Sequence, residues 1–253
     1  MASLRNVAAP YWAEFIGTLL LTLIGLGATA QSLTSSHKTD ALSNSAAWGT
    51  AVTLGIWVSE HVSGGHINPA ITIARFLFSN FSLRQVVGYI AAQTLGAFTG
   101  ALLVWLNFAS SLGELKHKDG VHPASRAFIT ANDTWPGLVN EITATFVFVI
   151  AVFAISDQTS NAKNIAPLAL GLAFTGASLA VSSPLTLALN PARDFGPRVF
   201  AALTYGLDVF ADHSFYFWVP IAGPIIGAIL GAFVYEWLVK RDAEYHHSLE
   251  DGN

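Results

Sequence analysis

The sequence predicts an all-α membrane protein with six transmembrane helices and two shorter helices that enter the membrane without crossing it. Three observations lead to this prediction. The 253 residues are 53% hydrophobic and only 11% charged, whereas a soluble domain has about 25% charged residues. The charges cluster between long apolar runs. The triplet Asn-Pro-Ala occurs twice, once in each half of the chain.

Six apolar runs are long enough to span a membrane, because a hydrocarbon core of about 30 Å requires roughly 20 helical residues. Two shorter helical stretches begin at the Asn-Pro-Ala triplets, with Asn as the N-cap and Pro at the first helical position. Each of these is about half a membrane long. The predicted spans are 11–31, 43–61, 85–108, 137–156, 164–182 and 215–239, and the half-helices are 68–78 and 191–203.

The two halves of the chain repeat the same order of elements. Glu14 lies in Glu-Phe-Ile-Gly-Thr at the start of the first span, and Glu141 lies in Glu-Ile-Thr-Ala-Thr at the start of the fourth. Three spans per half is an odd number, so the second half is inverted relative to the first, as in membrane facilitators. We expect one transmembrane domain over 1–253: repeat one at about 11–108, a loop at 109–136, repeat two at about 137–240 and a flexible tail at 241–253.

Lysines and arginines in short loops favour both termini on the cytoplasmic side. The long loop weakens this preference, because it adds Lys116, Lys118 and Arg126 to the outer side. The sequon at Asn132 would then face outside and the one at Asn80 inside, and a chance match is the default for both. With this orientation the inner side carries Arg5, Arg75, Arg84, Lys163, Lys240 and Arg241, and the short outer loops carry Lys38.

Small residues recur at the spacing that lets helix backbones approach closely in lipid. We expect these residues to serve packing within the bundle and assign them no transport role. They are Gly96, Gly100, Gly223, Gly227 and Gly231.

The chain resembles the aquaporin family over about residues 11–240, and specifically its aquaglyceroporin branch, the glycerol facilitators. The resemblance rests on His66-Ile67-Asn68-Pro69-Ala70-Ile71-Thr72 and on Leu189-Asn190-Pro191-Ala192-Arg193-Asp194-Phe195-Gly196-Pro197-Arg198. Asp194, Arg198, Pro220 and Ile221 fit the glycerol-facilitator branch. The resemblance implies a homotetramer with one pore per subunit.

The resemblance also implies that the two half-helices meet N-terminus to N-terminus near the middle of the membrane. Their dipoles would place partial positive charge in the pore, which disfavours cations and protons. Asn68 and Asn190 would cap their helices and also point their side-chain NH₂ groups into the lumen. His66 would line the inner half of the pore through its backbone carbonyl.

By the same resemblance, four residues form the narrowest point of the pore: Trp48, Gly176, Leu187 and Arg193. Arg193 is charged at membrane depth and is therefore a functional candidate, the alternative being a salt bridge with Asp194. An apolar wall facing a guanidinium suits a polyol, whose hydroxyls accept hydrogen bonds. Leu187 replaces the usual aromatic, and the segment 178–185 is about two residues longer than in bacterial relatives. We expect a filter that passes water and glycerol.

Four further side chains, in two pairs, have two interpretations each. Glu14 and Glu141 could relay protons, but the resemblance favours a structural role in which each accepts hydrogen bonds from loop N–H groups. His61 titrates between pH 5 and 8, so with Glu60 it could gate the inner mouth. The simpler interpretation is a partly solvated pair at a helix end.

These observations favour a passive plasma-membrane channel for glycerol, water and small neutral solutes. A coupled secondary transporter would require an ion site near the midplane, and the positive half-helix ends and Arg193 argue against a cation there. Gly176, Asp194 and Arg198 argue against a strictly water-selective channel. The sequence shows no nucleophile–base pair, metal cluster or phosphate loop, so an enzyme is not expected. The absence of cysteines excludes disulfides. No cofactor, metal or nucleic-acid partner is expected, only membrane lipid.

Overall fold

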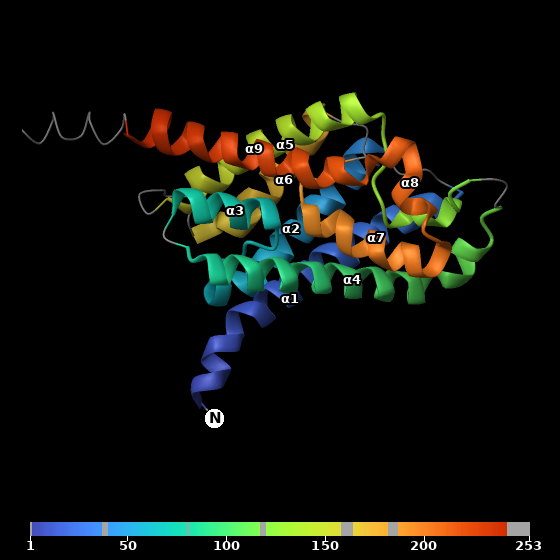
Figure 1. Cartoon of the computed structure of the whole chain (residues 1–253), viewed down its shortest axis with the longest axis horizontal. Coiled ribbons are helices and arrows are strands. Elements are labelled where there is room, and N and C mark those ends of the chain that lie inside the picture. The colour runs from blue at the N-terminus through green and yellow to red at the C-terminus, as the bar shows by residue number, and fades with distance from the viewer. Residues whose placement is uncertain are drawn as a thin grey trace, which may run out of the picture.

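The structure, a computed structural model, describes residues 2–36, 40–79, 81–116, 120–157, 164–181 and 187–241. Its helices lie side by side along one long axis and form a bundle (Figure 1). The first repeat contains α1 (Ala2–Thr34), α2 (Ala41–Ser63), α3 (Pro69–Phe78) and α4 (Leu83–Gly113). The second contains α5 (Thr134–Ser156), α6 (Ala166–Val181), α7 (Pro191–Tyr205) and α9 (Val219–Val234), which continues as the π-helix η4 (Tyr235–Lys240).

This element order confirms the predicted fold, with α3 and α7 as the two half-helices. The main differences lie at the ends. Helix α1 begins at Ala2 rather than at residue 11, and α9 begins at Val219 rather than at 215. Three short helices were not predicted, because none contains an apolar run of membrane length. They are η1 (Pro123–Ala127), α8 (Asp208–Phe215) and η3 (Tyr216–Trp218). The sequon at Asn80, the segment 182–186 and the tail beyond Arg241 lie outside the described residues.

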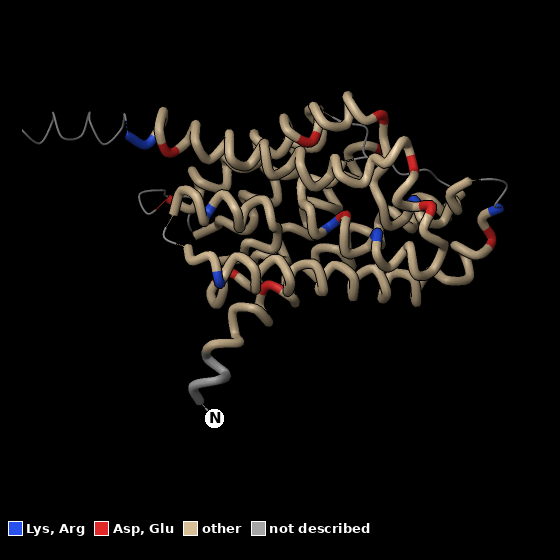
Figure 2. The backbone as a smooth tube through the Cα atoms, viewed as in Figure 1, with Lys and Arg blue, Asp and Glu red and all other residues tan. Residues whose placement is uncertain are grey.

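The bundle has two distinct ends. We call the end where α2 and α5 finish, at Ser63 and Ser156, the termini end, because the chain starts there and η4 finishes there (Figure 1). We call the opposite end, which carries η1 and α8, the loop end. Figure 2 shows that most charged residues lie near these two ends and few lie between them.

Four helical segments are by themselves long and apolar enough to cross a membrane: Val7–Thr34, Leu83–Gly113, Thr134–Ser156 and Asp208–Lys240. The two remaining predicted spans, α2 and α6, do not reach that level of length and apolarity within the described residues. Helix α6 has only 16 described residues. Helix α2 buries several polar side chains against the protein interior, including Asn44, Ser45 and Ser59, which lowers its average apolarity.

The glycines singled out in the sequence do lie at close helix contacts. A Cβ at Gly96 would collide with the backbone carbonyl of Phe15 in α1, and one at Gly227 with that of Ile142 in α5. A Cβ at Gly231 would lie only 2.6 Å from the carbonyl oxygen of Phe146. The packing prediction is therefore confirmed: these glycines allow α4 to approach α1, and α9 to approach α5, backbone against backbone.

We expect Gly96→Ala to lower the thermal midpoint of the detergent-solubilised protein by several degrees. The added methyl must push α1 and α4 apart, and such overpacking costs about 1–3 kcal/mol. Gly27→Ala in α1 is the matched control, because nothing lies within 4 Å of a Cβ placed there. The control should be neutral or slightly stabilising, since alanine favours a helix over glycine. Equal midpoints for the two variants would contradict the packing role of Gly96.

Candidate pore and its lining

The two half-helices meet N-terminus to N-terminus at the centre of the bundle, with α3 in one half of its length and α7 in the other (Figure 1). Each begins with the N-cap asparagine that the sequence indicates. The Asn68 Oδ1 accepts a hydrogen bond from the Ala70 N–H at 2.9 Å. The Asn190 Oδ1 accepts from the N–H groups of Ala192 at 3.0 Å and Arg193 at 3.2 Å. These bonds satisfy helix N–H groups that have no partner within the helix.

The asparagine side chains also connect the two repeats. The Asn68 Nδ2 donates to the Leu189 carbonyl at 2.8 Å, and the Asn190 Nδ2 donates to the Ile67 carbonyl at 2.8 Å. Both asparagines line the central cavity. Because an amide NH₂ has two hydrogens, one hydrogen of each asparagine remains available to a molecule inside the cavity.

The two residues that accept these cross-repeat bonds have left-handed backbone conformations. Ile67 has φ of 43° and Leu189 has φ of 54°. Such angles are uncommon for residues other than glycine and are costly for a β-branched residue. They occur at corresponding positions, one residue before each asparagine, so the same strained turn is built twice.

Buried carboxylates hold both turns. Glu14 accepts from the N–H groups of His66 at 2.9 Å and Ile67 at 2.6 Å. It also accepts from the Ser63 hydroxyl at 2.6 Å and the Gln93 amide at 2.7 Å.

Glu141 does the same in the second repeat. Its two oxygens accept from the N–H groups of Ala188 at 2.6 Å and Leu189 at 2.8 Å. Glu14 and Glu141 are fully buried, and neither is among the residues that line the cavity. This geometry matches the structural interpretation rather than the proton relay. Gln93, which the sequence analysis did not identify, also donates a hydrogen bond to the Glu14 carboxylate.

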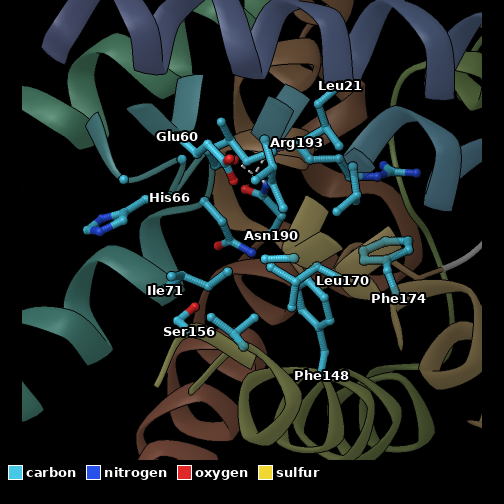
Figure 3. Close-up of a pocket in the computed structure, with 18 of the residues that line it drawn as sticks. Leu21, Glu60, His66, Ile71, Phe148, Ser156, Leu170, Phe174, Asn190 and Arg193 are labelled. Atoms are coloured by element: carbon cyan, nitrogen blue, oxygen red, sulfur yellow. Dashed lines mark hydrogen bonds between the residues drawn. The ribbon is translucent and has the colours of Figure 1, made fainter. Parts of the chain in front are cut away.

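A cavity runs between the repeats. In Figure 3, Glu60, His66 and Ile71 lie toward one end, Phe174 and Arg193 toward the other, and Asn190 between them. Most of its walls are apolar, whereas the polar groups come from the two half-helix turns and from a few single side chains. The apolar lining includes Leu21, Val52, Ile56, Phe148, Val152 and Leu170.

Arg193 lies against Trp48 on the loop-end side of the asparagines. Its Cζ is 4.3 Å from the centre of the Trp48 ring, within the range of a cation–π interaction. The Arg193 side chain is only 5% exposed, and its Nη1 has no hydrogen-bond partner among the described residues. The alternative salt bridge with Asp194 is not formed, because the Asp194 carboxylate pairs with Arg198. The cavity therefore contains a guanidinium with unused donors.

Gly176 is not among the residues that line this cavity, unlike Trp48 and Arg193. The residues of α6 that line it are Ala166, Leu170 and Phe174, spaced by one helical turn. Gly176 is two residues beyond Phe174, hence rotated by about 200°. It lies on the exposed face that also presents Leu172 and Leu179. Phe174 was missed, although its spacing of four residues from Leu170 was visible in the sequence.

Leu187 is buried in the hydrophobic core and is not among the lining residues, whereas its neighbour Ala188 is. The residues between Val181 and Leu187, which include half of the segment expected to be longer, lie outside the described part of the chain.

Asp194 and Arg198 form a buried ion pair that organises the loop end. The Arg198 Nε donates to the Asp194 Oδ1 at 2.7 Å, and its Nη atoms donate to the carbonyls of Thr130 and Val209, both at 2.7 Å. The Thr130 N–H and hydroxyl in turn donate to Asp194, at 2.8 and 2.6 Å. The pair thus connects α7 to the segment before α5 and to α8. Pro220 and Ile221 lie in the first turn of α9 and are not among the residues that line the cavity.

His66, Glu60 and His61 are placed at the termini end. The His66 Nδ1 lies 3.1 Å from the Thr72 hydroxyl, and its ring points away from Asn190 (Figure 3). Glu60 lines the cavity, whereas the His61 side chain is 86% exposed. Their side chains are 3.8 Å apart. The gating hypothesis for this pair stays a prediction.

This arrangement is that of a multi-pass membrane channel built from inverted repeats. The family model for the major intrinsic proteins matches residues 2–235. The chain is 34% identical to aquaglyceroporin-2 of Rhizophagus irregularis, over 90% of this chain and 76% of that protein. It is 38% identical to aquaglyceroporin-3 of Trypanosoma brucei brucei, over 91% of this chain and 79% of that one.

A solved structure agrees with these similarities. The aquaglyceroporin from Plasmodium falciparum superimposes with a TM-score of 0.82 at 28% identity, covering 93% of this chain and 98% of that one. The chain therefore belongs to the major intrinsic protein family, a family of membrane channels and not of enzymes.

We expect Arg198→Leu to destabilise the protein by about 3–5 kcal/mol, because it leaves the buried Asp194 carboxylate without its cation. Adding Asp194→Asn to this variant should recover part of the loss, since the unpaired charge is removed. Thermal unfolding in detergent measures both effects.

Arg126→Leu is the matched control for this experiment. It breaks the partly exposed pair with Asp212, whose nitrogen–oxygen distance is 2.7 Å, and it should cost less than about 1 kcal/mol. Similar losses for Arg126→Leu and Arg198→Leu would contradict a central role for the buried pair.

Proposed function

We propose that this protein is a passive channel that conducts glycerol, water and related small neutral solutes while excluding ions and protons. The observation that carries the proposal is the contact between Arg193 and Trp48 inside the cavity. A polyol has an apolar carbon edge, which fits the indole, and hydroxyls that accept from the guanidinium. The similarity to proteins named aquaglyceroporins supports the same solute class.

Exclusion of cations follows from the two half-helices. Both N-termini point toward the centre of the cavity, and each contributes a partial positive charge. Arg193 adds a full positive charge on the loop-end side. Dehydration of a cation or proton next to these positive charges costs free energy. A neutral solute instead accepts hydrogen bonds from the free amide hydrogens of Asn68 and Asn190.

We propose that the selectivity filter consists of Trp48, Phe174 and Arg193, with Leu187 behind the wall beside Ala188.

We further propose that the chain is one channel domain that assembles as a homotetramer in the plasma membrane. Both described chain ends lie at the termini end of the bundle (Figure 1), which supports a common side for them. We place that side in the cytoplasm, because short-loop arginines lie there. Exposed apolar residues such as Leu95, Leu172 and Leu230 would face lipid or neighbouring subunits.

Stopped-flow light scattering on proteoliposomes tests the proposal. An impermeant osmolyte should cause fast shrinkage, and a glycerol gradient should cause shrinkage followed by fast reswelling, both relative to protein-free liposomes. Fast shrinkage without reswelling would indicate a water-selective channel. No acceleration of either process would contradict the channel proposal under the conditions of the assay.

We expect Leu187→Phe to lower glycerol permeability more than water permeability, because a larger side chain behind the wall at Ala188 narrows the passage for the larger solute. The same scattering assay on matched amounts of reconstituted protein measures both rates. Leu187→Val is the control, since it removes volume instead of adding it. Equal glycerol permeability for Leu187→Phe and the unsubstituted protein would refute a size-setting role for Leu187.

A further inference from the structure

A second arginine lines the same cavity. Arg75 lies in α3, seven residues after Asn68, which places it about 10 Å along the helix axis toward the termini end. Its Cζ is 4.3 Å from the centre of the Phe153 ring. Arg193 lies against Trp48 at the same distance on the other side of the asparagines. Each half of the cavity therefore carries one guanidinium on one aromatic ring.

The guanidinium donors of Arg75 have no acceptor among the described residues. Among the described residues, no acceptor forms a hydrogen bond with Arg75 and no carboxylate lies within 4.0 Å of it. Glu236 of η4 attracts it only electrostatically. A guanidinium has five N–H donors and stays charged, so the side chain of Arg75 can donate hydrogen bonds to a molecule in the cavity.

Phe153 fixes how the guanidinium is presented. The Phe153 ring is only 2% exposed and belongs to the hydrophobic core, so its position is fixed by packing. The cation–π contact with the ring uses none of the N–H donors of the guanidinium in a hydrogen bond. Val152 and Ser156, which belong to the same helix as Phe153, also line the cavity.

An acceptor lies at the same end of the cavity. Glu60 lines it near the end of α2, and the only interaction found for its carboxylate in the described chain is the 3.8 Å approach to His61. Arg75 and Glu60 together supply donors and an acceptor with opposite charges. A hydroxyl can accept from Arg75 and donate to Glu60, whereas a cation would be repelled by Arg75 and an anion by Glu60.

We propose that Arg75, Phe153 and Glu60 form a second binding station for hydroxyl-bearing neutral solutes at the termini end of the pore, with Arg75 as the residue that determines solute preference. This inference rests on the proposed function. It assigns to the termini-end mouth the chemistry that Trp48 and Arg193 supply on the loop-end side.

We expect Arg75→Leu to lower the ratio of glycerol to water permeability about tenfold, because a charge-assisted hydrogen bond to the solute is lost. Water permeability should be unchanged or higher. Arg84→Leu is the matched control, since it removes an exposed arginine in the first turn of α4 that does not line the cavity. Arg75→Lys, which keeps the charge but loses the flat fork, should give an intermediate ratio.

The outcomes separate this inference from the proposed function. If the unsubstituted protein reswells in glycerol and Arg75→Leu keeps the same ratio as Arg84→Leu, the second station is refuted and the proposed function stands. If the unsubstituted protein does not reswell in glycerol, the proposed function fails, and the inference fails with it.

A second measurement does not depend on how well Arg75→Leu folds. The chain contains no cysteine, so single cysteines can be modified without removing others. Arg75→Cys treated with a bulky methanethiosulfonate reagent should lose most of its water and glycerol permeability, because the adduct projects into the pore. Arg84→Cys should react without loss. Labelled Arg75→Cys that conducts like the unlabelled variant would overturn the placement of Arg75 on the solute path.

Discussion

The structure depends on one constraint: two helices that end at membrane depth must have their free N–H groups satisfied inside the protein. The chain meets this constraint with reciprocal hydrogen bonds between repeats. Asn68 and Asn190 each cap their own helix through the amide oxygen and bind the opposite turn through the amide nitrogen. Because each repeat completes the other, neither half-helix turn is fully bonded without its partner. The arrangement also leaves one amide hydrogen of each asparagine available inside the cavity.

The supporting carboxylates follow from the same constraint. The left-handed turns at Ile67 and Leu189 point backbone N–H groups away from any helix or sheet. Glu14 and Glu141 accept from these groups, so a buried charge is stabilised by short hydrogen bonds to several donors. Placing one carboxylate behind each turn keeps both charges off the solute path. The cavity can therefore be positive at its centre and apolar along its walls.

The two repeats share this centre but differ toward the ends. At the loop end, Asp194 and Arg198 use their charges on each other and on backbone groups, which leaves Arg193 free to contact Trp48. At the termini end, Arg75 contacts Phe153 without a paired carboxylate in the described chain. The buried arginine Arg198 thus differs from the cavity-lining Arg75 and Arg193 in that its N–H groups bind acceptors within the described protein.

The sequence by itself determined the element order, the inverted repeat and the asparagine caps, because hydrophobic length, proline position and motif duplication are local signals. It also indicated the glycine contacts such as Gly96, since their spacing is a property of one helix. Only the tertiary structure decided which face of α6 lines the cavity, the face that carries Leu170 and Phe174. It likewise decided that Asp194 pairs with Arg198 rather than Arg193, and that Gln93 supports Glu14. These contacts join residues far apart in the chain, and a helix's rotation about its axis is fixed by its neighbours rather than by its own sequence.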